Sequence, residues 1–137
     1  MRITEEERAR ALEKLGLTDN LMKLTQGKEV PKLLQDHCRI LKYYYENDVK
    51  LPEQIFIPLW EGHSSITCFR ELDDGVEFFK FYIESPDKFF VLGSSIHAVI
   101  TNLLAWLWTE EEIEDNQLIE LANYLDYPYI DSFLNEI

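Results

Sequence analysis

The stretch of residues 65–92 constrains the fold most strongly, because two turn signals divide it into short runs of strand-like sequence. In the first signal, Asp73-Asp74-Gly75, the glycine supplies the positive φ that a tight hairpin turn needs. The second is Ser85-Pro86-Asp87. The preceding strand-like run, residues 55–60, contains Pro58. Because proline has no N–H group, this run is expected at a sheet edge or beside a bulge. The sequence therefore predicts an antiparallel meander of about four strands, over residues 55–60, 65–71, 76–83 and 88–92.

Helical signals flank this meander on both sides. Thr4 and Glu7 fit a capping box, and the residues from Ile96 to Trp108 carry a wide apolar stripe at the helical period. Helices are predicted over residues 4–15, 18–26, 31–47, 96–108 and 117–125, with a last one opened by Pro128. The fold class is thus α+β: N-terminal helices, a central meander, and C-terminal helices packed on one face of the sheet. A chain of 137 residues with 46% hydrophobic side chains is expected to form a single domain over residues 1–137.

The charge of the chain is negative and unevenly distributed. The net charge is −13, yet residues 1–50 hold 10 basic and 9 acidic side chains, whereas residues 51–137 hold 3 basic and 17 acidic ones. Such a half repels nucleic acid and anionic membranes and attracts basic partners. The start of the chain has no apolar signal segment, and its longest apolar stretch, residues 96–108, is too short to cross a bilayer. We therefore expect a cytoplasmic protein that binds neither nucleic acid nor membrane.

Most catalytic motifs are missing from the sequence. There is no nucleophile elbow, no phosphate-binding glycine loop, no dinucleotide fingerprint and no H-E-x-x-H site. His37, His63 and His97 share no ligand spacing, so no metal and no cofactor are expected. Cys38 and Cys68 are interpreted as buried, reduced thiols.

His63-Ser64-Ser65 leaves a hydrolase open as a remote alternative. Adjacent residues of an extended segment point to opposite faces, so His63 could act as a base for Ser65 but not easily for Ser64. No glycine-rich oxyanion turn accompanies them. The pattern favours a loop between two strands, and no catalytic residue is assigned.

Tryptophans next to an acidic tract are the strongest candidates for partner binding. Aromatic side chains anchor interfaces, and acidic neighbours steer basic partners. Core packing of at least one tryptophan competes with this interpretation, and the acids could also cap a helix or form a solvated turn. The candidate partner-binding residues are Trp60, Trp106, Trp108, Glu110, Glu111, Glu112, Glu114 and Asp115.

From the segment 51–62, LPEQIFIPLWEG, the sequence resembles the SUKH superfamily, the group of Syd and the yeast killer-toxin-resistance and cell-wall-assembly regulators. The similarity continues through residues 76–82, 89–95 and 96–108 in the same order and covers residues 30–130. In that family, helices lead into an aromatic-rich antiparallel meander, followed by a serine-capped amphipathic helix. The resemblance implies a SUKH-like, non-enzymatic binding domain, since the family offers no catalytic residues to carry over.

Bacterial members of the family are regarded as immunity proteins that bind and neutralise toxin domains in the cytoplasm. The resemblance therefore implies a toxin domain as the partner, and the charge asymmetry suggests that its surface is basic, as in a nuclease. The alternative is a regulatory scaffold that binds an endogenous protein, in cell-wall assembly or secretion. We expect a monomer or a weak homodimer.

Overall fold

The computed structural model describes residues 2–46, 51–52 and 54–137. Its four strands form one antiparallel sheet in the order β1-β2-β3-β4, which confirms the predicted meander. The elements are α1 (Glu5–Lys14), α2 (Asp19–Thr25), the 3-10 helix η1 (Lys32–Leu34), α3 (Lys42–Glu46), β1 (Ile57–Glu61), β2 (Ser65–Leu72), β3 (Gly75–Tyr82), β4 (Ser85–Gly93), α4 (Ile96–Glu110), α5 (Asp115–Tyr124) and α6 (Ile130–Glu136).

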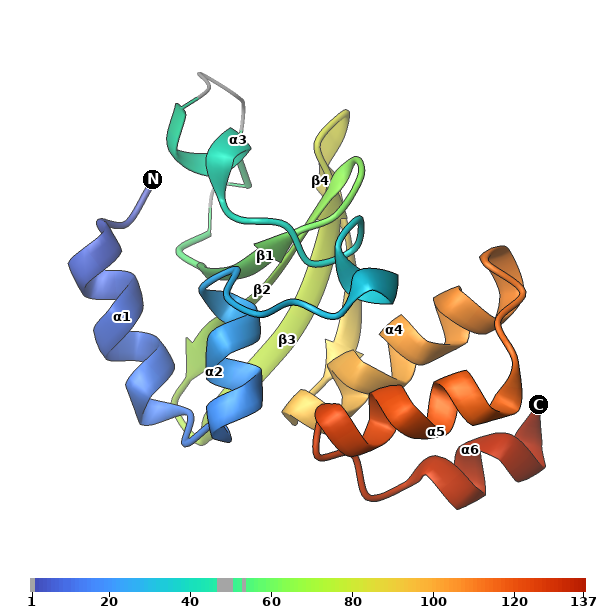
Figure 1. Cartoon of the computed structure of the whole chain (residues 1–137). Helices are drawn as coiled ribbons and strands as arrows, with labels where there is room; N and C mark the ends of the chain where they lie inside the picture. Colours follow the sequence, from blue (N-terminus) through green and yellow to red (C-terminus); the bar gives the residue numbers. More distant parts are fainter. Residues whose placement is uncertain (1, 47–50, 53) are drawn as a thin grey trace.

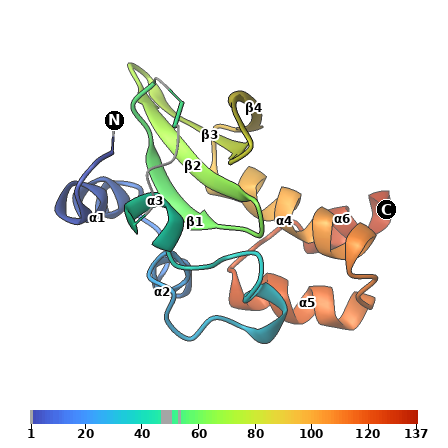
Figure 2. The ribbon, with the colours of Figure 1, turned by 90° about the horizontal axis from the view of Figure 1, so that it is seen from above.

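Helices α1, α2 and α4 pack on the same face of the sheet, at opposite ends of the strand order. Helices α1 and α2 contact β1, whereas α4 contacts β3 and β4 and is followed by α5 and α6 (Figures 1 and 2). Thr4 and Glu7 form the predicted capping box, with the Glu7 N–H donating to Thr4 Oγ1 over 3.1 Å and the Thr4 N–H donating to Glu7 Oε1 over 3.0 Å. The α+β class with C-terminal helices on the sheet is therefore confirmed.

Strand β1 is an edge strand with an irregular register between Pro58 and Trp60, which agrees with the prediction from proline. At this irregularity, two backbone carbonyls of β1 accept hydrogen bonds from the side chain of Arg8 in α1. Its Nε donates to Pro58 O over 2.8 Å, and its Nη2 donates to Leu59 O over 2.8 Å. The same Nη2 donates to Thr25 O over 2.6 Å. One side chain thus joins α1, the end of α2 and β1.

Two hydrophobic clusters occupy opposite faces of the sheet. The larger one combines residues of α1, α2, α4, α5 and α6 with Ile57, Trp60, Phe69 and Phe78 of the sheet. The smaller one, which we call the Phe56 cluster, consists of Leu41, Tyr44, Phe56, Ile66, Cys68, Phe79 and Phe81. Cys38 lies in the larger cluster and Cys68 in the smaller, both buried and unpaired by disulfides, as predicted. Burial raises the pKa of both thiols.

The helix predicted over residues 31–47 is wrong. Only η1 and α3 are helical, and between them Arg39 pairs with β1: its N–H donates to Glu61 O over 2.7 Å, and the Glu61 N–H donates to Arg39 O over 3.0 Å. The apolar residues of this segment pack on opposite faces of the sheet. Leu34 and Cys38 lie in the larger cluster, whereas Leu41 and Tyr44 lie in the Phe56 cluster. A single helix could not reach both faces. The expected end at Asn47 lies outside the described residues.

Glu61 also holds the start of α3. Its two carboxylate oxygens accept hydrogen bonds from the backbone N–H groups of Tyr43 and Tyr44 at 3.0 and 2.6 Å. Burial raises the pKa of Glu61, and these two donors oppose the rise. A β1 side chain thus replaces the local capping residue that the sequence of α3 lacks.

The last hairpin and the α4–α5 junction differ slightly from their predicted positions. Strand β4 begins at Ser85, so the chain turns at Ile83 and Glu84 and not at Ser85-Pro86-Asp87. Helix α4 extends two residues beyond Trp108, and α5 begins at Asp115. Gly93, where β4 leads towards α4, has a φ of 151°, and a Cβ there would lie 2.7 Å from Ala98 Cβ. Glycine permits both this backbone conformation and the close approach.

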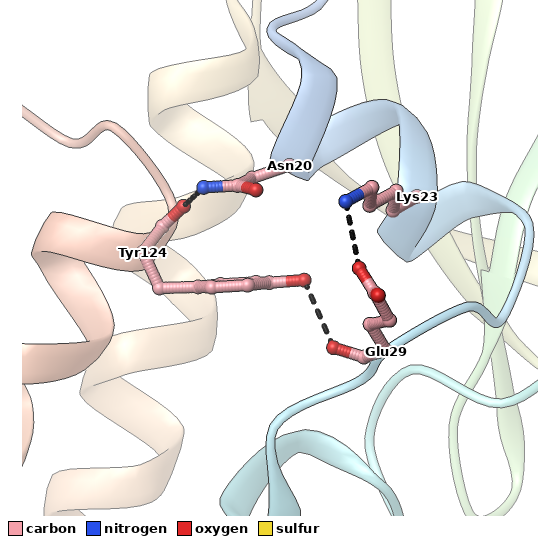
Figure 3. A network of polar contacts seen from close by, with 4 residues as sticks. All are labelled: Asn20, Lys23, Glu29 and Tyr124. Atoms are coloured by element: carbon pink, nitrogen blue, oxygen red, sulfur yellow. Dashed lines mark hydrogen bonds and ion pairs between the residues drawn. The ribbon is translucent and has the colours of Figure 1, made fainter.

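A polar network joins the N-terminal segment to α5. The Asn20 Nδ2 donates to Tyr124 O over 3.0 Å, and the Tyr124 hydroxyl donates to Glu29 O over 3.2 Å (Figure 3). Lys23 Nζ lies 2.6 Å from Glu29 Oε2 in the same network. Segments about 100 residues apart in sequence therefore lie side by side, with the Tyr124 side chain between them.

Candidate functional site

A pocket opens between α4, the β1–β2 hairpin and the far ends of β3 and β4. Its volume is about 160 Å³. The lining residues combine apolar and aromatic side chains with polar ones and a single lysine: His37, Trp60, Gly62, His63, Ser64, Ser65, Thr67, Lys80, Tyr82, Leu92, Val99, Asn102, Leu103 and Trp106. We call it the Lys80 pocket.

The strand register determines which side chains form the floor of this pocket. Thr67 pairs with Lys80, and Lys80 pairs with Phe90, so these side chains share the face that α4 covers. Ser65 pairs with Tyr82 on the same face. Helix α4 supplies Asn102 and Trp106, which are one helical turn apart and therefore neighbours on its surface.

Lys80 lines the pocket next to the rings of Tyr82 and Trp106. Its ammonium nitrogen is 5.4 Å from the centroid of the Trp106 ring and 5.7 Å from that of Tyr82. It donates to Asn102 Oδ1 over a long 3.5 Å. No carboxylate of the described residues pairs with it, and burial lowers its pKa. In an acidic protein, the pocket therefore holds a half-buried positive charge that no carboxylate of the described residues neutralises.

His63 and Ser65, the pair of the hydrolase alternative, both line this pocket. His63 is exposed at the β1–β2 hairpin, where the Gly62 N–H donates to Ser65 O over 2.8 Å. The loop that the sequence favours is present, and within the described residues neither Ser64 nor Ser65 is hydrogen-bonded to His63.

The three tryptophans have different environments. Trp60 is 2% exposed and belongs to the larger cluster, with one side on the pocket. Trp108 is half-buried and packs against that cluster, whereas Trp106 is 41% exposed. The competing interpretation, core packing, therefore applies to Trp60 and Trp108, and Trp106 alone of the three presents much of its ring to solvent.

The acidic candidates form an exposed ridge at the α4–α5 junction. The ridge consists of Glu110, Glu111, Glu112, Glu114 and Asp115. Glu110 lies one turn after Trp106 on α4, and Glu111 Oε1 is 3.4 Å from Nε2 of His37, which lines the pocket. Glu114 and Asp115 occupy the N-cap and first turn of α5, as a capping role predicts. The structure thus brings Trp106, the acidic ridge and the pocket together.

Sequence reasoning missed Lys80, Tyr82 and Asn102. The sequence does contain a signal for Lys80. This lysine interrupts the aromatic run from Phe78 to Tyr82, and without it both faces of the strand would be apolar. The contact with Trp106 has no such signal, since only the packing of α4 on β3 brings these residues together.

Comparisons with family models, with curated proteins and with solved structures give no match to this chain. The SUKH resemblance stays a prediction. No helix within the described part of the chain combines the length and apolar character needed to span a membrane. Among residues 2–46, 51–52 and 54–137, no three His, Cys, Asp or Glu side chains are grouped closely enough to hold a metal ion.

Proposed function

We propose that this chain is a non-enzymatic binding protein that docks on a protein partner with a basic surface, as an immunity protein docks on a toxin domain. The observation that carries the proposal is the position of Trp106, a large exposed aromatic side chain directly beside the acidic ridge. Buried aromatic anchors supply affinity in protein interfaces, and acidic surroundings accelerate the encounter with a basic partner.

Folding stability does not account for the whole ridge. Glu110 and Glu111 lie at the carboxyl end of α4, where the helix dipole disfavours negative charge by about 0.3–1 kcal/mol per group. The last turn contains no basic residue. Glu112 has a φ of 51°, a left-handed conformation that costs a non-glycine residue about 1–2 kcal/mol. Residues that are locally unfavourable for folding stability, as these glutamates are, are typical of functional surfaces.

Exposed aromatic side chains extend the surface from Trp106 to the edge of the sheet. Lys80 links Trp106 to Tyr82, whose ring centroid is 5.8 Å from that of Phe90. Phe90 is 52% exposed and lies on the edge strand β4. We call Trp106, Tyr82 and Phe90 the aromatic row. It provides the apolar centre of an interface, and the ridge provides a charged rim.

The toxin-directed form of this proposal is tested by capture and co-expression. The tagged chain is used to isolate binding proteins from its native host, and each captured protein is then expressed alone and together with this chain. A basic protein that is toxic alone and harmless with this chain supports immunity. A non-toxic endogenous protein would replace immunity by the regulatory-scaffold alternative, and a partner without basic surface charge would contradict the charge argument.

Neutralising the ridge is expected to slow association with that partner by about tenfold or more at low salt, because electrostatic steering raises association rates by 10–1,000-fold. The change is Glu to Gln or Asp to Asn at all five ridge positions. Association rates are measured by stopped flow across a series of salt concentrations, and the variant should show a flatter salt dependence.

A control variant carries the same change in net charge away from the ridge. It replaces five exposed glutamates by glutamine, at Glu5, Glu6, Glu13, Glu46 and Glu71. This variant is expected to keep most of the rate and salt dependence of the unmodified chain. Equal slowing in both variants would reduce the effect to net charge, and an unchanged rate in the ridge variant would contradict the proposed interface.

Trp106→Ala is expected to weaken the complex mainly through faster dissociation, with a loss of about 30-fold or more in affinity, as for an aromatic hot spot worth at least about 2 kcal/mol. The control is Tyr129→Ala, which removes another exposed aromatic ring, outside the aromatic row, that is 52% exposed. Dissociation rates from the captured partner are compared by surface plasmon resonance. Equal losses in the two variants would remove Trp106 from the interface.

A further inference from the structure

We propose that the Lys80 pocket binds a small monocarboxylate with an apolar body, such as an aromatic acid. This inference does not depend on the protein partner proposed above. It combines a lysine that no carboxylate of the described residues pairs with, the aromatic and aliphatic walls around it, and a volume suited to a small organic acid.

The charge of Lys80 favours an anionic ligand. Its ammonium has three donor hydrogens, and its only polar contact in the described part of the chain is the long one of 3.5 Å to Asn102 Oδ1. The rings of Trp106 and Tyr82 hold the ammonium in place but accept no conventional hydrogen bond. An incoming carboxylate would accept the remaining donors and would favour the charged form that burial disfavours.

The surroundings favour one negative charge over two. Lys80 is the single lysine or arginine of the pocket lining, and Glu111 lies 3.4 Å from the lining residue His37. Within the whole segment 51–137 the acidic side chains number 17 against 3 basic ones. A dianion such as phosphate would meet more repulsion than attraction, whereas a carboxylate forms one ion pair.

The walls favour an apolar body on the ligand. Trp60, Leu92, Val99, Leu103 and Trp106 supply apolar and aromatic surface. The volume of about 160 Å³ is several times the roughly 30 Å³ that one water molecule occupies in the liquid. Ser64 and Ser65 line the same cavity, and a serine hydroxyl can donate to a carboxylate oxygen. Small-molecule sites commonly combine such apolar walls with a few polar groups.

The test is an NMR titration of the full chain with benzoate at constant ionic strength and pH. The side-chain N–H signals of the three tryptophans act as built-in reporters, because Trp60 and Trp106 line the pocket and Trp108 does not. We expect benzoate to shift the first two and to leave Trp108 nearly unchanged. Benzamide has the same shape without the charge and is expected to shift none of them.

Lys80→Met keeps the length of the side chain and removes its charge. We expect it to weaken benzoate binding by about 10- to 150-fold, the factor for a charge-assisted hydrogen bond of 1.5–3 kcal/mol. Lys88→Met makes the same change at an exposed lysine of β4 outside the pocket and should bind benzoate like the unmodified chain. If Lys80→Met does not fold, Lys80→Gln takes its place, and the benzoate–benzamide comparison stands without either variant.

Two sources of the carboxylate are separated by a second titration. N-acetylphenylalanine presents the carboxylate of a chain terminus, whereas benzoate represents a free small acid. If benzoate or N-acetylphenylalanine binds more tightly than the corresponding amide, the carboxylate site is supported. The acid that binds more tightly identifies the source of the carboxylate. Equal binding of acid and amide, tighter binding of phosphate than of benzoate, or shifts of Trp108 without shifts of Trp60 and Trp106 would overturn the proposal.

Discussion

Phe56→Ala is expected to lower the free energy of unfolding by about 3–5 kcal/mol, as for other buried phenylalanines. Phe56 is 0% exposed at the centre of the Phe56 cluster. Its ring centroid lies 5.9 Å from that of Tyr44, 6.0 Å from Phe79 and 5.4 Å from Phe81, with edge-to-face geometry in each pair. Alanine would leave a cavity and remove three aromatic contacts at once.

Ile55→Ala is the matched control for this variant. Ile55 is the preceding residue and is 61% exposed, so its truncation should change the free energy of unfolding by no more than about 0.5 kcal/mol. Both values come from chemical denaturation monitored by circular dichroism. A loss below about 1 kcal/mol for Phe56→Ala would show that the second face of the sheet is not covered as described.

Arg8→Met is expected to lower the free energy of unfolding by about 2–4 kcal/mol, because three backbone carbonyls lose a charged donor together. Methionine keeps much of the apolar stem, so the loss reports mainly on the hydrogen bonds. Arg10→Met removes an exposed arginine from the same helix and should have little effect. Equal losses for the two variants would mean that net charge, and not the contact with the irregular β1 strand, determines the result.

Much of the fold could be predicted from local patterns. Gly75 begins β3 directly after the Asp73-Asp74 turn because a tight turn needs its backbone freedom, and Thr4 caps the start of α1 because its side chain satisfies a free N–H group. The apolar stripe of α4, with Val99, Ile100, Leu103, Leu104 and Leu107 buried, follows the helical period. Signals of this kind act over a few residues, so a single sequence contains them in full.

The failures have a common physical origin in long-range contacts. The segment 31–47 has helical spacing, but Arg39 gains two backbone hydrogen bonds by pairing with Glu61, and the chain crosses from one face of the sheet to the other. Trp60 and Trp106 look alike in the sequence as candidate anchors. The sheet buries the first, and the edge of α4 exposes the second.

The candidate site was predicted only in part. The acidic ridge is continuous in sequence, so its charge and its place next to Trp106 required no structure. The Lys80 pocket is lined by His37, which lies between η1 and α3, by the β1–β2 hairpin, and by β3, β4 and α4. The register of β3 with β2 and β4 determines which strand residues share its floor. A shift of one residue would turn Lys80 to the opposite face.

The sequence by itself determined the helix–meander–helix order, the Asp73-Asp74 turn, the Thr4 cap of α1 and the concentration of negative charge after Lys88, because these depend on neighbouring residues and on composition. Only the tertiary structure decided which tryptophan is exposed, how the second face of the sheet is covered, and that Lys80 meets the ring of Trp106. These features arise where elements pack against one another, and packing depends on contacts between residues far apart in the chain.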